Sequence, residues 1–149
     1  MTSALPLEFG DRLPDRNYRL RPGSYAVVLG EDDQVALLQT VHGLVLPGGG
    51  AEHGESPEAT LRREILEECG YELEILKPIG FAIEYVFSQD EGYFAKECSF
   101  FLTRFDQPVT QPIEHDHELT WRPISEAISK LTFKSQSWAV SSVASIREF

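Results

Sequence analysis

Short runs of apolar residues separated by polar turns predict strands in the first third of the chain. Residues 24–29 (SYAVVL) and 35–39 (VALLQ) are rich in β-branched and aliphatic side chains, which strands favour. The polar turn GEDDQ connects the two runs, and this order predicts a β-hairpin. Residues 43–46 predict a third short strand, which ends at Pro47 and the glycines after it. Residues 1–19 are interrupted by Pro and Arg, so we expect an irregular N-terminal lead-in there.

A helix is predicted shortly after the glycines, because both a start signal and an end signal are present. Ser56 can cap free backbone amides, Pro57 fits the first helical turn, and Glu58 complements the positive end of the helix dipole. Gly70 suits the left-handed position that follows many helices, so we expect this helix to end at Cys69.

The second half of the chain predicts a pair of long strands followed by a short strand and two helices. Residues 72–88 and 93–105 are aromatic and β-branched on either side of the polar turn QDEG, which predicts an antiparallel pair. We expect a short strand at residues 119–122 and helices at residues 123–131 and 135–147. Strands interleaved with helices in this way favour one α/β sandwich.

Composition and charge limit the size of the protein and its partners. A chain of 149 residues with 42% hydrophobic residues fits a single globular domain, which we place at residues 20–149. The net charge of −11 repels phosphate backbones and anionic lipids, so we expect no long nucleic acid and no membrane as a partner. The N-terminus lacks an apolar segment flanked by basic residues, and Cys69 and Cys98 form no CxxC motif. We therefore expect a cytoplasmic protein with reduced thiols.

Three glutamates share one face of the first predicted helix. Glu64, Glu67 and Glu68 are spaced i, i+3 and i+4, which places them within an arc of about 100°. Like charges at this spacing repel one another, and Arg63 can relieve only part of the repulsion. Carboxylates are hard oxygen ligands that suit Mg²⁺ or Mn²⁺. A solvated acidic face is the alternative, and the glutamates taken alone favour it.

The glycines and the helix together change this balance. From Gly49 to Tyr71 the chain reads GGAEHGESPEATLRREILEECGY. This segment resembles the Nudix box, Gly-x5-Glu-x7-Arg-Glu-U-x-Glu-Glu-x-Gly-U, in which U is a bulky and usually aliphatic residue. Every fixed position of the box is present, and Tyr71 at the last U is the one soft departure. On these residues the chain is identified as a member of the Nudix (MutT-like) hydrolase family.

The resemblance implies a fold, an activity and a cofactor. Nudix proteins have an α/β fold, an α/β/α sandwich with a mixed β-sheet. They typically hydrolyse a diphosphate linkage in a nucleoside diphosphate joined to another moiety, and the cofactor implied here is Mg²⁺ (or Mn²⁺). The expected partner is a small nucleotide-type substrate, and a homodimer is one assembly that the family uses besides the monomer. The alternative is a catalytically silent Nudix-fold module that binds or senses a nucleotide.

The box also implies roles for individual residues. Arg63 is implied to orient the glutamates through an ion pair, and Glu55 is implied to brace the loop before the helix. Glu67, Glu68 and Arg63 are therefore the expected catalytic residues of the box. The metal ligands implied by position are Glu64, Glu67, Glu68 and the backbone carbonyl of Gly48.

The general base remains open between a box glutamate and an acidic residue on a later loop. That loop is residues 113–121 (IEHDHELTW), where an acidic residue shortly before a Trp resembles the family's loop position. Glu118 is the favoured candidate and Glu114 the second, with a solvated acidic loop as the alternative. His115 and His117 are expected to be exposed polar residues.

Two further residues are candidates for contacting the substrate. Arg21 precedes the first strand, at a position where related Nudix proteins often carry a basic residue that could meet phosphate. Tyr85 is one of several aromatic residues on the long strands, and it could stack on a base. The alternatives are a surface arginine and an aromatic residue of the core.

Overall fold

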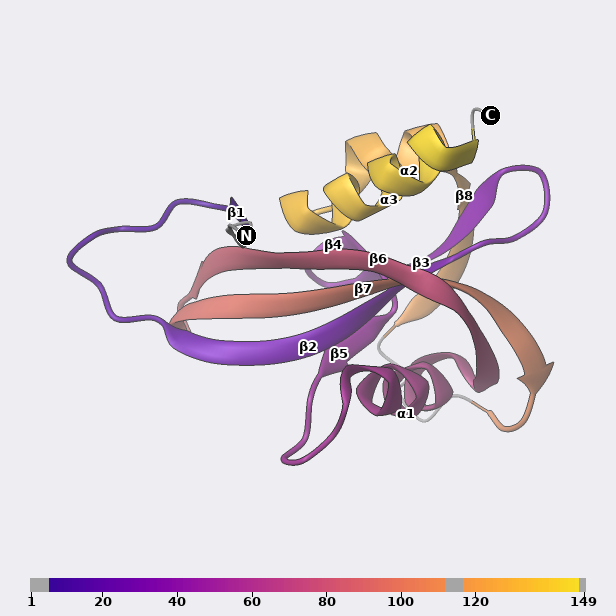
Figure 1. Cartoon of the computed structure of the whole chain (residues 1–149), viewed down its shortest axis with the longest axis horizontal. Coiled ribbons are helices and arrows are strands. Elements are labelled where there is room, and N and C mark those ends of the chain that lie inside the picture. The colour runs from indigo at the N-terminus through magenta and orange to yellow at the C-terminus, as the bar shows by residue number, and fades with distance from the viewer. Residues whose placement is uncertain (1–5, 112–116, 148–149) are drawn as a thin grey trace, which may run out of the picture.

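The computed structural model describes residues 6–111 and 117–147, in which two β-sheets lie between helices (Figure 1). The larger sheet has the order β1 (Leu7–Phe9), β6 (Tyr71–Ser88), β7 (Gly92–Pro108), β2 (Arg19–Val28) and β5 (Gly48–Gly50). β6 and β7 form the predicted long antiparallel pair. β2 pairs in parallel with β7 and antiparallel with β5, so the sheet is mixed, as expected.

The smaller sheet is antiparallel and corrects one prediction. Its order is β4 (Gly43–Val45), β3 (Gln34–Thr40) and β8 (Glu118–Pro123). The predicted hairpin between β2 and β3 is wrong, because only a single bridge between Leu29 and Val35 connects them. A strand has two hydrogen-bonding edges: β7 takes one along the whole of β2, and β5 takes the other at residues 23–25. β3 therefore continues into the other sheet.

The lead-in contains a strand that the sequence did not predict. Residues Leu7–Phe9 form β1, which pairs in parallel with β6 at the edge of the larger sheet. Tyr18, later in the lead-in, packs edge-on against Tyr85 and Tyr93, with ring centroids 5.1 and 5.5 Å apart. A three-residue strand is too short to show an alternating pattern, so the periodicity of the sequence could not reveal it.

The helices lie on opposite sides of the sheets and confirm the α/β/α sandwich. α1 (Pro57–Cys69) lies on one side, and α2 (Ile124–Lys130) and α3 (Lys134–Arg147) lie together on the other (Figure 1). All three match the predicted helices to within a few residues. None of the helices in the described part of the chain is long and apolar enough to cross a membrane.

Both ends of α1 are fixed by the residues that predicted them. The Ser56 hydroxyl accepts a hydrogen bond from the Ala59 N–H at 3.1 Å, which satisfies a backbone amide that has no partner within the helix. Gly70 adopts a φ of 77°, and its N–H donates to the Leu66 carbonyl at 3.0 Å. The start and the end of α1 are therefore fixed, and with them the positions of its glutamates along the helix.

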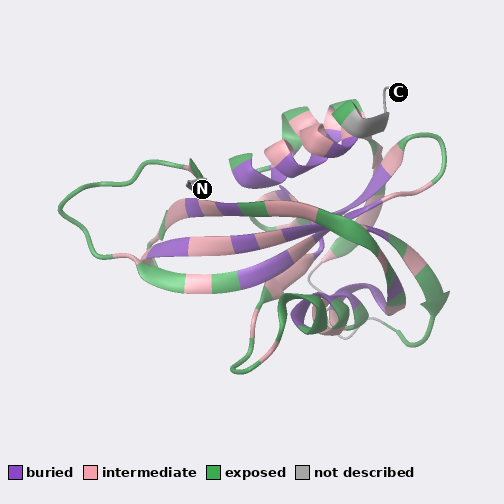
Figure 2. Cartoon of the chain, in the orientation of Figure 1, coloured by how far each residue is buried: buried purple, intermediate pink, exposed green. Residues whose placement is uncertain are grey.

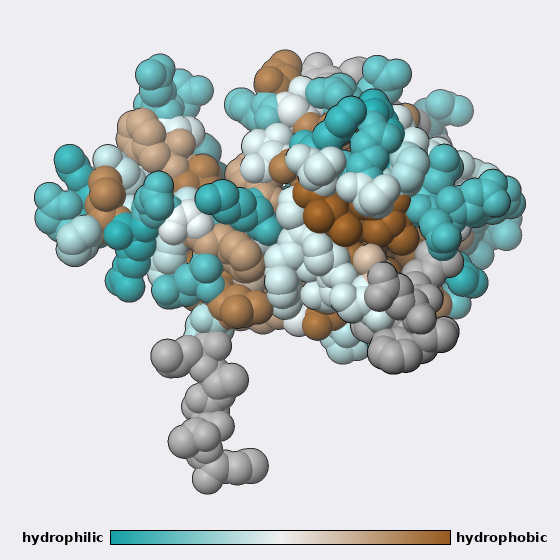
Figure 3. All heavy atoms as spheres, turned by 90° about the horizontal axis from the view of Figure 1, so that it is seen from above, coloured by the Kyte–Doolittle hydropathy of each residue, from teal (hydrophilic) through white to brown (hydrophobic). Residues whose placement is uncertain are grey.

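Two hydrophobic clusters hold the layers together, one against α1 and one against α3. Figure 2 shows buried positions along both of these helices and along the strands between them. Leu61, Ile65 and Cys69 face the first cluster, which leaves the glutamate arc at its rim. Val140 and Val143 of α3 belong to the second. The face seen in Figure 3 is mostly hydrophilic with separate apolar patches, in keeping with the net charge of −11.

Candidate metal centre and active site

The glycine strand β5 brings backbone groups to the glutamates of α1. The sequence predicted only a strand end and a loop at these glycines, but they form the edge of the larger sheet. The Ala26 N–H donates to the Pro47 carbonyl at 2.9 Å. Ladder hydrogen bonds use alternate residues, so both backbone groups of Gly48 face away from β2. The Gly48 N–H donates instead to Glu68 Oε1 at 2.9 Å.

Gly49 allows a carboxylate to pass close to the strand. A Cβ atom at this position would lie 2.5 Å from Cδ of Glu64 and 2.6 Å from its Oε2. Any side chain at Gly49 would therefore fill the space that the Glu64 carboxyl group now occupies. The Glu64 side chain is 14% exposed, and that of Glu68 is 5% exposed, so both carboxylates are held against the protein rather than in bulk solvent.

Arg63 connects the glycine strand, the preceding loop and the glutamate arc. Its Nε donates to Glu55 Oε2 at 2.7 Å, and its Nη2 donates to the Gly50 carbonyl at 2.9 Å. Nη1 donates to Glu64 Oε1 at 3.0 Å and to Glu67 Oε2 at 3.5 Å. Glu55 and Glu64 raise the pKa of the Arg63 guanidinium, with the hydrogen bond to Glu55 as the largest cause. Arg63 thus connects the loop, the glycine strand and two of the three arc glutamates.

Glu55 fixes the loop between β5 and α1. Its Oε1 accepts hydrogen bonds from the Glu52 N–H at 2.7 Å and from the Thr60 hydroxyl at 3.0 Å. The hydrogen bond from Arg63 is the largest cause that lowers the pKa of Glu55, to about 2. Glu55 therefore stays ionised at neutral pH and holds one side of the Arg63 fork.

The donors gathered here suit a divalent cation, although they are turned toward protein partners. In the described ranges, no group of three His, Cys, Asp or Glu side chains is arranged to hold a metal ion. Arg63 donates hydrogen bonds to Glu64 and Glu67, and the Gly48 amide donates one to Glu68. The donor chemistry fits Mg²⁺ or Mn²⁺, because carboxylates and a glycine carbonyl are hard oxygen ligands on adjacent elements.

The loop before β8 brings His117 to the glutamates, a contact that the sequence did not predict. Nδ1 of His117 lies 3.2 Å from Oε2 of Glu68, so this histidine is not the exposed polar residue we expected. Glu118 begins β8 and is exposed, whereas the next residue, Leu119, packs against the cluster beneath α1. Side chains alternate along a strand, so Glu118 points away from α1. Glu114 lies outside the described residues.

Arg21 lines a cavity on the other side of the β2–β5 edge. The cavity has a volume of about 240 Å³ and is bounded by Arg21, Tyr25, Gly50, Phe94, Lys96 and Phe133. The Arg21 guanidinium makes a two-pronged ion pair with Glu91 at 2.6 and 2.8 Å, and it lies 4.5 Å from the centroid of the Phe94 ring. Arg21 is therefore next to the glycine strand, but Glu91 already balances its charge.

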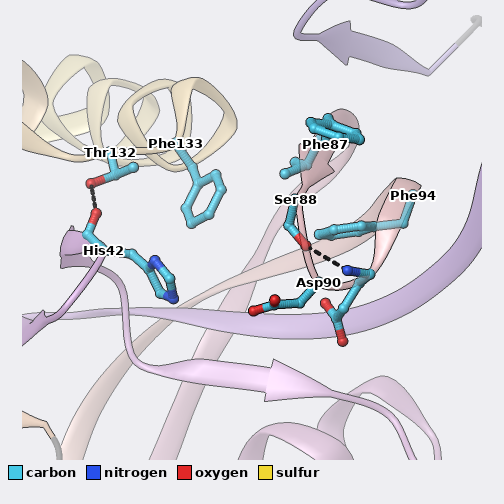
Figure 4. A pocket seen from close by; sticks show the side chains of 9 residues that line it. His42, Phe87, Ser88, Asp90, Phe94, Thr132 and Phe133 are labelled. Atoms are coloured by element: carbon cyan, nitrogen blue, oxygen red, sulfur yellow. Dashed lines mark hydrogen bonds between the residues drawn. The ribbon is translucent and has the colours of Figure 1, made fainter.

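A larger hollow of about 630 Å³ adjoins this cavity through the shared Phe94 and Phe133. Figure 4 shows Phe133, from the loop between α2 and α3, and Phe94, on β7, facing the same space as His42. The Thr132 hydroxyl donates to the His42 carbonyl at 3.0 Å, which ties the two loops together. The hollow is thus large, and its lining combines the aromatic rings of Phe87, Phe94 and Phe133 with the acidic Asp90 and Glu91.

Tyr85, the second candidate for contacting the substrate, does not line either of these spaces. Its hydroxyl donates to Glu8 Oε1 at 2.7 Å, and Arg12 lies 5.5 Å from the centroid of its ring. The structure therefore brings Tyr85 together with the lead-in rather than with Arg21.

Comparisons with known proteins agree with this fold. The NUDIX domain family model matches residues 19–142, and the chain belongs to this family. Among solved structures, a NUDIX hydrolase from Nitrosomonas europaea superposes with a TM-score of 0.71 at 19% identity, over 85% of this chain and 90% of that one. A MutT protein from Bacillus halodurans gives 0.66 at 23% identity, over 81% of this chain and 80% of that one. At these identities the two structures show the fold alone.

One curated relative matches a shorter segment. A Bacillus subtilis protein named "Putative 8-oxo-dGTP diphosphatase" is 42% identical over 60 residues, which is 39% of this chain. The match spans 40% of the length of that relative. The similarity is therefore confined to a part of each protein.

Proposed function

We propose that the protein is a divalent-metal-dependent hydrolase that cleaves a diphosphate linkage in a nucleoside diphosphate joined to another moiety. The observation that carries the proposal is the convergence of the α1 glutamates on the glycine strand, with Arg63 bonded to both. Glu64, Glu67, Glu68 and the Gly48 carbonyl would hold Mg²⁺ or Mn²⁺. When bound, such a cation neutralises phosphoryl charge and lowers the pKa of a bound water.

The protein's own residues would hold these donors in place. Arg63 keeps Glu64 near Gly49, and the Gly48 amide and His117 fix the two oxygens of Glu68. Positioning of this kind lowers the barrier because less rotational freedom is lost when the reacting groups meet. An acidic protein could then bind an acidic substrate, because a cation held by these residues would neutralise charge on both.

The same geometry bears on the general base. The Glu67 side chain is 34% exposed, more than those of Glu64 and Glu68, so of these three carboxylates it is the one most open to an attacking water. We therefore propose Glu67 as the first candidate for accepting the proton. Glu118, which faces away from α1, and Glu114 become the second candidates.

Turnover of a substrate panel tests this function. Purified protein would be incubated with Mg²⁺ or Mn²⁺ and with ADP-ribose, a dinucleoside polyphosphate, a nucleotide sugar and 8-oxo-dGTP, the last because of the name of the relative. Glu67→Gln and Glu68→Gln should each lose at least about 100-fold in turnover, the scale on which a lost transition-state partner acts. Glu118→Gln should remain active if Glu67 is the base.

The matched control is Glu72→Gln, which removes an exposed carboxylate just beyond the box. It should keep wild-type turnover. Absence of turnover on the whole panel, or equal turnover in the wild type and both box variants, would overturn the enzyme proposal. Stabilisation by nucleotides without turnover would support the silent binding module instead.

We also propose a cytoplasmic location, and the homodimer and the monomer remain the two candidate assemblies. Cys69 and Cys98 are both buried free thiols, which suits a reducing compartment. Light scattering on purified protein tests the assembly, and fractionation of cells tests the location.

A further inference from the structure

Lys96 places a cation in the wall of the cavity beside the glycine strand. It lies on β7, directly opposite Arg21 of β2. Its Nζ lies 3.6 Å from the centroid of the Phe133 ring and 4.9 Å from that of Tyr25. Within the described residues, the ammonium group donates no hydrogen bond and makes no ion pair, so these aromatic faces are its contacts.

The carboxylates of Glu84 and Glu91 are already engaged elsewhere, although the charge of Glu84 partly offsets the lowering of the pKa of Lys96. Glu84 is the partner of Lys96 across the β6–β7 ladder, but its carboxylate accepts hydrogen bonds from the backbone amides of Lys134 and Ser135 at 3.1 and 2.9 Å. It therefore anchors the start of α3. Glu91 is committed to Arg21. Lys96 thus differs from Arg21, because no carboxylate lies in direct contact with its charge.

A cation in this position is costly unless an acceptor joins it. Burial lowers the pKa of Lys96, and loss of hydration is the largest cause. Aromatic faces attract an ammonium group but accept none of its hydrogen bonds in the way that oxygen does. An unsatisfied donor in the wall of a cavity is thus prepared for an acceptor that arrives with a ligand.

The cavity and the glutamate site lie on either side of the glycine strand and share Gly50. Gly50 lines the cavity, and its carbonyl accepts a hydrogen bond from Arg63, which in turn bonds to Glu64. A ligand that reached Lys96 would therefore lie across β5 from the carboxylates. A nucleotide has suitable acceptors at both its phosphate and its base.

We propose that Lys96 is a specificity-determining residue that donates a hydrogen bond to an oxygen acceptor of the nucleotide substrate, either a phosphate oxygen or a base carbonyl. This inference rests on the proposed hydrolase function and adds the residue that selects the ligand. Arg21 and Phe94 border the same space, and the hollow lined by Phe133 continues from it. The cavity of Lys96 is thus the part of the substrate site that discriminates between nucleotides.

Binding of three small probes tests the proposal. The affinities of wild type, Lys96→Met and Lys96→Arg for dGMP, dAMP and deoxyguanosine would be measured by calorimetry in Mg²⁺ buffer. Lys96→Met should bind dGMP at least about tenfold more weakly, the loss expected for one hydrogen bond to a charged donor. Weakening with dGMP and dAMP but not deoxyguanosine assigns the acceptor to phosphate. Weakening with dGMP and deoxyguanosine but not dAMP assigns it to the base carbonyl.

Stability separates recognition from a structural role. Met fills the space between two rings without a desolvated charge, so Lys96→Met should melt at the same temperature as the wild type or higher. Lys96→Arg keeps the charge and should recover part of the affinity. Lys77→Met, which removes an exposed lysine outside this cavity, is the matched control and should bind like the wild type.

Several results would overturn the inference. They are equal affinity of Lys96→Met and wild type for all three probes, no binding of any probe to wild type, or weaker binding accompanied by a lower melting temperature. Turnover of the same preparations keeps the two proposals distinct. Wild-type turnover with unchanged Lys96→Met binding rejects the role of Lys96 alone, whereas lack of turnover rejects the hydrolase even if Lys96 controls binding.

Discussion

The two sides of the β2–β5 edge handle charge in opposite ways. On the α1 side, Arg63 is shared among Glu55, Glu64 and Glu67, so the charged groups largely satisfy one another. On the other side, Lys96 has aromatic contacts and no carboxylate in direct contact among the described residues. The first site is therefore held in place by its own network, whereas the second depends on its ligand.

The largest effect is expected from removing the centre of the network. Arg63→Ala leaves the box carboxylates without their shared cation and releases Glu64 from its place near Gly49. Displacement of catalytic groups by about 1 Å can cost on the order of 100-fold in rate, so we expect a loss of that size together with a lower melting temperature. Steady-state turnover and thermal melting measure the two effects.

Two further variants make this prediction specific. Arg63→Lys should recover little, because an ammonium group cannot reproduce a planar fork that reaches several acceptors. Arg62→Ala removes the neighbouring arginine, whose Nη1 donates to the Leu73 carbonyl at 2.5 Å, and it should leave turnover near the wild-type level. Equal losses in Arg62→Ala and Arg63→Ala would mean that helix stability, rather than the network, explains the effect.

A smaller effect is expected from filling the space beside the strand. Gly49→Ala puts a Cβ atom 2.5 Å from Cδ of Glu64. That carboxyl group is the end of a flexible side chain, so it can move away with little cost to the fold. We expect turnover to fall roughly tenfold, because a partly displaced carboxylate should lose less than a fully displaced catalytic group. The melting temperature should change little.

The adjacent glycine supplies the control for this variant. At Gly50 the nearest atom to a Cβ would be the Pro22 carbonyl oxygen, 3.9 Å away, which is ordinary contact. Gly50→Ala should therefore keep most of the activity. If it lost as much as Gly49→Ala, flexibility of the whole strand would be responsible rather than the approach of Glu64.

The elements that the sequence predicted correctly are determined by residues close together in the chain. α1 carries its own start and end signals, and the glutamate spacing depends only on helix geometry. By contrast, β1 forms only by pairing with a distant strand, and β2 and β3 join different sheets. The periodicity along one strand does not encode such pairing. His117 reaches Glu68 only because β8 pairs with β3 beside α1. Lys96 likewise gains Phe133 from a distant loop, so no local pattern could mark its cavity.

The smallest effect is expected in the stability of the protein at acidic pH, which should depend on the ionisation of Glu55. The folded-state pKa of Glu55 is about 2, below its ordinary value of 4.5. A depressed carboxyl pKa contributes stability that is fully present above pH 4.5 and is lost as the pH falls toward 2. Glu55→Gln should therefore melt below wild type at pH 7, and the gap should narrow between pH 4.5 and pH 2. Melting curves across this range measure the gap.

Glu72→Gln, on the exposed control carboxylate, should show a much smaller gap at pH 7. A gap for Glu55→Gln that stayed constant with pH would mean that packing, and not ionisation of Glu55, supports the loop.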